Sequence, residues 1–376
     1  MNIDEYIENK FLIPIEKNSN TIGIEIEMPV ISKDGIIDMD NLQLLFNEFL
    51  KIGYKIISKD NKENITAVCN DENDKISLEY SVNTIEISLS KSKNIYELKN
   101  RFDFFYKFIN DFIKKFKYEL ICCGINPNYK KINRVCLDDN YYKTIEKLLK
   151  SNTYKNEKLF GEFCSYCCSI QTHIVPKRIY LAKYLNVFNY ITDIKENIFA
   201  NSYMNELNTC NARKVLWHNC NFGNNNIGKL PFLKNEKDII EMYKNSYLNI
   251  ISRDNEYIIL PKPKLKNYLN LKEINGINIK NEKIKIEPQY YDFDRFRSYR
   301  DIELTKYGTI EIRSDCMQGN NNIFKLVAFN VGVSANIEKA YQLVIENNKN
   351  FEKWLEIAKE GLNMRNFNEE IILLEE

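Results

Sequence analysis

The acidic residues best placed to do chemistry in this chain lie in stretches that otherwise look like β-strands. In "TIGIEIEMPV", residues 21–30, Glu25 and Glu27 alternate with isoleucines. Alternation with a period of two sends the two sets of side chains to opposite faces, so Glu25 and Glu27 point the same way. They are then about 7 Å apart, and no basic residue in this strand relieves their repulsion. A bound cation would relieve it.

Three further segments, residues 75–90, 164–175 and 307–315, also have a polar face backed by apolar side chains. Their polar faces carry these candidate binding residues: Glu79, Glu86, Gln171, His173, Glu311 and Arg313. Taken singly, each face is the ordinary solvated face of a sheet. When the four polar faces are considered together, acidic residues dominate them, and the lysines are expected to lie in loops and helices. One shared sheet would present at least four carboxylates, which suits hard divalent cations, and Arg313 would neutralise a phosphate or carboxylate.

Helical patterns separate these strands. Apolar residues recur at spacings of three and four in these segments: 41–52, 96–116, 141–150, 323–345 and 350–360. This order predicts an α+β fold with a mostly antiparallel sheet, one face lined by acids and the other covered by helices. Residues 218–232 and 290–301 look like irregular loops. Without an internal repeat or a flexible linker, a single domain over residues 1–376 is the simplest prediction.

The composition favours small-molecule partners. The 53 basic and 52 acidic residues give a formal net charge of +1, so no overall basic field attracts nucleic acid or an anionic membrane. No apolar run approaches the roughly 20 residues that span a bilayer, and the start of the chain lacks the pattern of a secretory signal. We therefore expect a cytoplasmic protein, and the composition indicates no oligomeric state.

The ten cysteines are expected to be reduced thiols. The alternative is a zinc site, because two of the cysteines have Cys-x-x-Cys spacing. It would be drawn from these residues: Cys164, Cys167, Cys168, Cys210, Cys220, His173 and His218. No second Cys-x-x-Cys pair follows, and residues 164–175 look like a strand, so buried inert thiols are the preferred interpretation.

The order and spacing of these motifs resemble glutamate-cysteine ligase, in the branch that plant enzymes share with bacterial carboxylate-amine ligases. The resemblance covers about residues 21–345. "GIEIE" is similar to the G-x-E-x-E strand of that family, and "SLEYSVNTIEIS" to its S-L-E-P-G-G-Q-F-E-L-S segment. "CCSIQTH" is similar to T-x-x-x-Q-V-[NH], "NARKVLWHN" to R-x-x-x-W, and "YGTIEIRSDC" to Y-L-E-x-R-x-x-D. The family's glycine pair is replaced here by Ser81, Val82 and Asn83, with one extra residue.

The resemblance implies a glutamine-synthetase-like catalytic domain that uses ATP and Mg²⁺ or Mn²⁺. The γ-phosphate of ATP would activate a carboxylate, and an amine would attack the acyl phosphate. The implied substrates are glutamate, through its side-chain carboxylate, and cysteine, as in glutathione biosynthesis. Such chemistry needs positioning and charge neutralisation more than a protein nucleophile, which fits a site of acids and arginines.

The resemblance also assigns roles to individual residues. The implied metal ligands are Glu25, Glu27, Glu79, Glu86, Gln171 and Glu311. The implied catalytic residues are Arg213 and Arg313, and the substrate or nucleotide contacts are His173, Arg213, Trp217 and Arg313. Since the chain has no Walker A motif and no G-x-G-x-x-G loop, Tyr203 and Trp217 are the candidates for stacking on adenine.

Three alternatives remain open from the sequence. The same ligation chemistry could use another amine or a peptide as acceptor. The acids could instead serve a two-metal phosphodiesterase or nuclease, although the near-zero net charge and the scarcity of histidine count against it. The third alternative is a binding protein without catalysis, which the retained acids argue against.

Overall fold

The computed structural model describes residues 2–16, 20–151, 161–220, 226–254 and 256–375. It combines helices with antiparallel sheets, which confirms the predicted α+β class. No helix within these ranges is long and apolar enough to cross a membrane.

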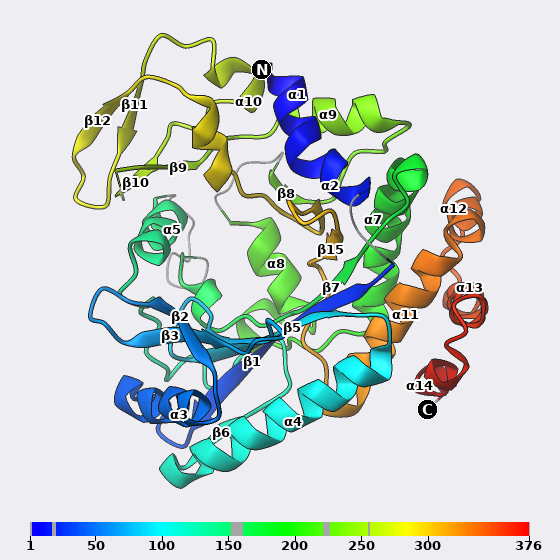
Figure 1. Cartoon of the computed structure of the whole chain (residues 1–376), viewed down its shortest axis with the longest axis horizontal. Helices are drawn as coiled ribbons and strands as arrows, with labels where there is room; N and C mark the ends of the chain where they lie inside the picture. Colours follow the sequence, from blue (N-terminus) through cyan, green and yellow to red (C-terminus); the bar gives the residue numbers. More distant parts are fainter. Residues whose placement is uncertain (1, 17–19, 152–160, 221–225, 255, 376) are drawn as a thin grey trace.

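The four segments with polar faces share one nine-stranded sheet with the order β14-β15-β7-β1-β5-β4-β3-β2, in which β6 also pairs with β1. All pairings are antiparallel. The long strand β1 crosses the middle of the molecule (Figure 1). The strand bounds are β1 Ile22–Ser32, β2 Lys55–Lys59, β3 Ile65–Cys69, β4 Lys75–Leu78, β5 Thr84–Ser92, β6 Tyr118–Leu120, β7 Ile170–Ile174, β14 Ile302–Leu304 and β15 Ile310–Ile312.

The register of this sheet gathers polar side chains on one face. Glu27 of β1 lies opposite Glu86 of β5, and Glu25 lies opposite Gln171 of β7. On the next strand, Glu311 of β15 lies opposite His173. Because directly opposed residues share a face, the acids of β1, β5 and β15 converge.

The other face of the sheet is the apolar core. Ile22, Ile24, Ile26 and Met28 are at most 1% exposed, and they belong to a cluster that includes helices α3, Met39–Lys51, and α4, Ile95–Ile113. Both helices begin at residues whose side chains cap the first turn, Asp38 and Asn94. Helices thus cover the apolar face, as predicted (Figure 1).

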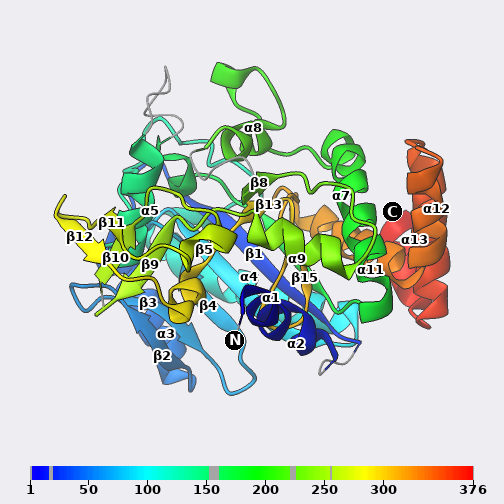
Figure 2. The ribbon, with the colours of Figure 1, turned by 90° about the horizontal axis from the view of Figure 1, so that it is seen from above.

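Smaller elements flank the main sheet. A four-stranded sheet, which the sequence analysis missed, lies at one end of the molecule, and helices α12 and α13 lie at the other (Figures 1 and 2). Its strands are β9 Ile250–Arg253, β10 Glu256–Ile259, β11 Ile274–Ile277 and β12 Lys283–Ile286. A parallel pair is formed by β8 Ile227–Gly228 and β13 Tyr299–Arg300. The remaining α-helices are α1 Ile3–Ile7, α2 Ile13–Glu16, α5 Asn140–Lys150, α7 Leu181–Ile198, α8 Ala212–His218, α9 Glu236–Lys244, α10 Leu265–Tyr268, α11 Ile323–Ala335, α12 Ile337–Ile345, α13 Phe351–Met364 and α14 Ile372–Glu375.

Several predicted boundaries were wrong. The helix expected over residues 323–345 divides into α11 and α12 at Asn336, whose backbone leaves the helical region and whose side chain binds Glu360. The strand expected over residues 164–175 begins only at Ile170, because the chain first makes a 3₁₀ turn in which the Tyr166 amide donates to the Phe163 carbonyl. The strand expected over residues 307–315 is limited to β15. The loop expected over residues 290–301 contains a 3₁₀ helix and β13.

Two close backbone approaches depend on glycine. Where α11 crosses α13, a Cβ on Gly361 would lie 1.9 Å from the carbonyl oxygen of Gly332. In the turn between β14 and β15, Gly308 has φ +73°, and a Cβ there would lie 2.4 Å from the backbone of Pro14. The N-terminal segment, residues 2–16, is therefore fitted tightly against the strand that carries Glu311.

Candidate active site

The polar face of the main sheet is the floor of a pocket of about 490 Å³. Its walls include Lys10 of the N-terminal segment and Tyr142 of α5. Glu86 is only 4% exposed and Glu311 only 7%. The interpretation of these strands as ordinary solvated faces is therefore wrong.

The structure brings nearly all of the predicted site residues to this pocket. The residues that line it are Glu25, Glu27, Glu79, Glu86, Gln171, His173, Arg213, Trp217, Glu311 and Arg313. Tyr203 is the exception, because it does not line the pocket and is 56% exposed. Tyr203 is therefore not placed to stack on a base in this pocket together with Trp217.

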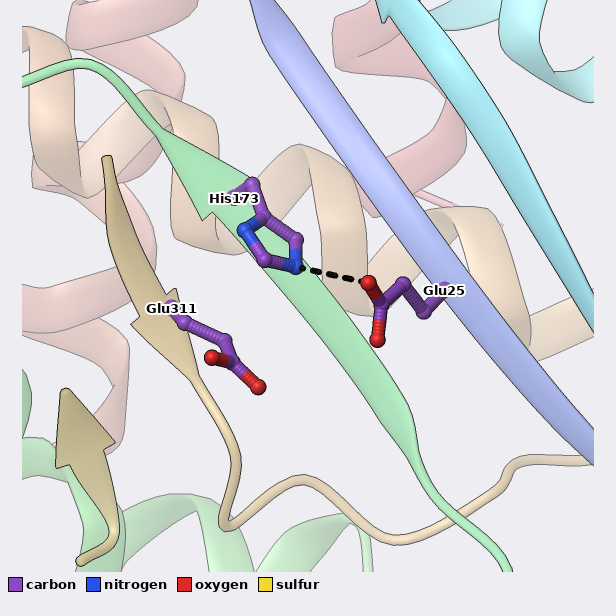
Figure 3. Close-up of side chains that lie close together, drawn as sticks. All are labelled: Glu25, His173 and Glu311. Atoms are coloured by element: carbon purple, nitrogen blue, oxygen red, sulfur yellow. Dashed lines mark ion pairs between the residues drawn. The ribbon is translucent and has the colours of Figure 1, made fainter. Parts of the chain in front are cut away.

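Glu25, His173 and Glu311 form a candidate cation site. Within the described residues they are the one group of three His, Cys, Asp or Glu side chains whose ligand atoms all lie within 4.8 Å of one another. They come from the adjacent strands β1, β7 and β15, and the two carboxylates point toward each other across β7 (Figure 3). Two carboxylates and an imidazole are ligands that divalent metals accept.

His173 is already oriented within this group. Its Nε2 lies 3.5 Å from Oε1 of Glu25, and its Nδ1 lies 3.2 Å from the hydroxyl of Thr309. Burial disfavours both charges of the pair, but their mutual attraction outweighs it, lowering the pKa of Glu25 and raising that of His173. The ring is thus held between β1 and β15.

Glu27 and Gln171 lie beside this group on the floor. Glu27 accepts hydrogen bonds from the Ser169 amide at 2.8 Å and from Gln171 Nε2 at 2.9 Å, while burial raises its pKa to about 7. Gln171 is 4% exposed, and its Oε1 has no hydrogen-bond partner among the described residues. A buried carbonyl oxygen without a donor next to carboxylates fits a bound cation.

Glu79 and Glu86 form the far side of the floor. Burial, and then the charges of Glu86 and Glu27, raise the pKa of Glu79, which accepts a hydrogen bond from the Tyr142 hydroxyl at 3.3 Å. Glu86 is paired with Lys75 of β4, whose Nζ lies 2.7 Å from Oε1. The expectation that lysines lie only in loops and helices was wrong at Lys75. The same period of two, which places Lys75 on the face of Ser77, could have found it.

The two predicted arginines differ in what they contact. Arg313 pairs with Glu311, and its guanidinium lies 5.6 Å from the centre of the Tyr299 ring. Arg213 donates to the main-chain carbonyls of Ser314 at 3.2 Å and Arg313 at 3.0 Å. Arg213 therefore positions the chain that carries Arg313, while Arg313 faces the acids.

Trp217 contributes to an aromatic wall. Its ring stacks on Tyr299 with centroids 4.9 Å apart and meets Phe163 edge to face at 4.7 Å. These contacts fix the indole, which still lines the pocket beside Arg213.

A buried ion pair supports the floor from behind. Lys195 of α7 lies 2.5 Å from Oδ1 of Asp315, and both side chains are at most 3% exposed. Asn330 of α11 donates to the other oxygen of Asp315 at 2.8 Å and to Thr172 of β7 at 3.2 Å. This network ties the segment after β15 to β7.

All ten cysteines lie within the described ranges, and none of them forms a disulfide. In the described ranges, no cysteine belongs to a group of three potential ligands with the spacing of a metal site, so the structure gives no support to the zinc alternative. Burial raises the pKa of the Cys164 and Cys167 thiols, as expected for inert packing.

Comparisons with known proteins add little to this geometry. No protein-family model and no curated protein sequence matches the chain. A bifunctional glutathione synthetase from Pasteurella multocida superposes with a TM-score of 0.38 and 8% sequence identity, over 99% of this chain and 47% of that one. The chain thus spans about half the length of that protein, and the likeness is too weak to support an argument about fold or function.

Proposed function

We propose that this chain is an ATP-dependent ligase that forms an amide between a carboxylate and an amine. One observation carries the proposal: a single pocket of about 490 Å³ combines a carboxylate–imidazole group suited to a divalent cation with the guanidinium group of Arg313. Phosphoryl transfer from ATP to a carboxylate needs charge neutralisation and orientation. The pocket offers both, without requiring a nucleophile from the protein.

The proposed roles follow the contacts. Glu25, His173 and Glu311 would hold Mg²⁺ or Mn²⁺, which when bound would supply positive charge beside the phosphates. The other floor residues, Glu27, Glu79, Glu86 and Gln171, remain candidate ligands for metal that arrives with the nucleotide. Arg313 would bind anionic oxygens of the substrates, Arg213 would position it, and Trp217 would form the wall against a base or an amino acid.

The substrates are the finer part of the proposal and depend on the motif resemblance. We place the side-chain carboxylate of glutamate as donor and cysteine as acceptor, in a single cytoplasmic domain of glutamine-synthetase-like fold. A different amine or a peptide acceptor is the second choice within the same chemistry. No feature of the described residues favours the phosphodiesterase alternative.

The test is amide formation with transfer of labelled oxygen. Purified protein, ATP, Mg²⁺ and a panel of amines are incubated with glutamate whose side-chain carboxylate carries ¹⁸O, and the products are read by mass spectrometry. An acyl-phosphate route transfers one labelled oxygen to the released phosphate for each amide formed. Amide formed with unlabelled phosphate would refute that route, and absence of amide with every amine would refute the ligase.

A further inference from the structure

Lys75 is a positive charge built into the floor of the pocket. It lies on β4 opposite Ser88, and Ser77 lies opposite Glu86, so the lysine reaches diagonally to Glu86 on β5. The Lys75 side chain is 34% exposed, whereas that of Glu86 is 5% exposed. The chain itself therefore supplies the counter-ion for its most buried floor carboxylate.

The oxygen of Glu86 that meets Lys75 is crowded. Besides the ammonium at 2.7 Å, Oε1 accepts hydrogen bonds from the hydroxyls of Ser88 at 2.6 Å and Ser77 at 3.4 Å. A metal ion could reach this oxygen only by displacing donors that the sheet holds in register. A doubly charged ion there would also face the ammonium at short range, where like charges repel strongly.

The cation site on the other side of the floor has a different basic neighbour, Arg313, which contacts Oε1 of Glu311. Glu25, His173 and Glu311 bring three ligand atoms within 4.8 Å of one another. In the part of the chain that the structure describes, Glu27, Glu79 and Glu86 form no comparable group. The floor is thus divided between a group shaped for a metal and a group already neutralised by Lys75.

We propose that Lys75 takes the place of a second divalent cation, so that the nucleotide-free protein binds one such ion, at Glu25, His173 and Glu311. This inference rests on the cation site of the proposed function. It concerns the protein before substrates bind, since a nucleotide would carry in its own metal together with phosphates that balance the lysine.

The test counts bound Mn²⁺ in the full, nucleotide-free chain, by equilibrium dialysis with electron paramagnetic resonance of the free ion. Wild type should bind one tight Mn²⁺. The Lys75→Gln variant should bind a second Mn²⁺ beside Glu86. Its affinity for this second ion should be at least about tenfold higher than that of the wild-type protein, because the competing charge is gone. Lys75→Arg should still bind one. Lys91→Gln is the matched control, since it removes the same charge from an exposed position on β5 and should also bind one.

The measurement separates this inference from the proposed function because it requires no turnover. Wild type that binds two Mn²⁺ with similar affinity, or none, would overturn the proposal. So would a Lys75→Gln chain that still binds one ion and melts at the wild-type temperature. If the Lys75→Gln variant unfolds, the same count of bound Mn²⁺ can be made on Lys75→Met, which keeps the aliphatic stem of the side chain and removes the charge. Adding Glu25→Gln to the lysine variant should bring the count from two back to one.

Discussion

At the scale of single residues, Glu25 and Glu311 offer the sharpest test of cation binding. Replacing either with Gln removes a charged ligand and keeps the shape of the side chain. Mn²⁺ affinity should therefore fall at least about a hundredfold, because even the loss of a residue that only supports a metal ligand costs about tenfold to a hundredfold. The melting temperature without metal should fall modestly, because Glu25 pairs with His173 and Glu311 pairs with Arg313, and either change removes one partner of a partly buried pair. Glu72→Gln, at an exposed turn, is the control. Unchanged Mn²⁺ affinity in both variants would remove the cation site from the proposal.

Arg313 belongs to the same scale. Arg313→Lys keeps a positive charge but loses the planar group that pairs with Glu311 and lies over Tyr299. We expect ligase turnover, kcat/KM, to fall at least about a hundredfold, since a lysine cannot replace a two-pronged contact. Steady-state kinetics would show this, with circular dichroism to verify the fold. An unchanged kcat/KM would mean that the guanidinium geometry is not used.

The sequence predicted these residues because period-two alternation depends on the strand alone. Glu25, Glu27, Glu86 and Glu311 could be assigned to polar faces without knowing which strands are neighbours. What could not be predicted is which face would be enclosed, since that depends on walls from distant segments. Tyr203 was misplaced for this reason, because its aromatic type alone does not determine whether its side chain joins a wall of the pocket.

At the scale of elements, the crossing of α11 and α13 is limited by Gly361. Gly361→Ala would improve helix propensity by up to about 1 kcal/mol, but the new Cβ would collide with the Gly332 carbonyl. We expect a net loss of about 1–3 kcal/mol in the free energy of unfolding, measured in urea. Gly319→Ala, which meets nothing within 4 Å, should change it by no more than about 0.5 kcal/mol. Equal effects of the two changes would contradict the crossing.

A second prediction at the scale of helices and strands concerns the ion pair of Lys195 with Asp315, which joins α7 to the segment after β15. Lys195→Met leaves a buried carboxylate without its partner, so unfolding free energy should fall by about 3–5 kcal/mol. Adding Asp315→Asn should recover part of the loss, as the uncompensated charge is removed. If the double variant is no more stable than the single one, the cost does not arise from that charge.

Strands were easier to predict than their ends, for a physical reason. The apolar alternation of β1 and β5 runs over many residues, whereas each strand of the second sheet is four residues long. A pattern so short cannot be told from chance, which is why the second sheet was missed. The break between α11 and α12 was also hidden, because apolar residues continue across Asn336 and the side-chain bond to Glu360 is a tertiary contact.

At the scale of the whole molecule, the N-terminal segment closes the pocket by packing on the turn at Gly308. Gly308→Ala would add both the cost of a left-handed alanine, about 1–2 kcal/mol, and a collision with Pro14. Gly53→Ala is a matched control, since Gly53 also has positive φ but meets nothing within 4 Å. The melting temperature should therefore fall clearly further for Gly308→Ala. Equal decreases would show that the N-terminal segment does not depend on this contact.

The three residues of the candidate cation site also determine when the site can exist during synthesis. Glu25, His173 and Glu311 come from the beginning, middle and end of the chain, so the site closes only after β15 has left the ribosome. Until then the edge of β7 that receives β15 stays unpaired, and an unpaired edge invites association with other chains. Contacts between such distant segments also form slowly. Nascent chains that end before β15 should therefore need protection by chaperones, and binding of Mn²⁺ would mark the moment when the sheet is complete.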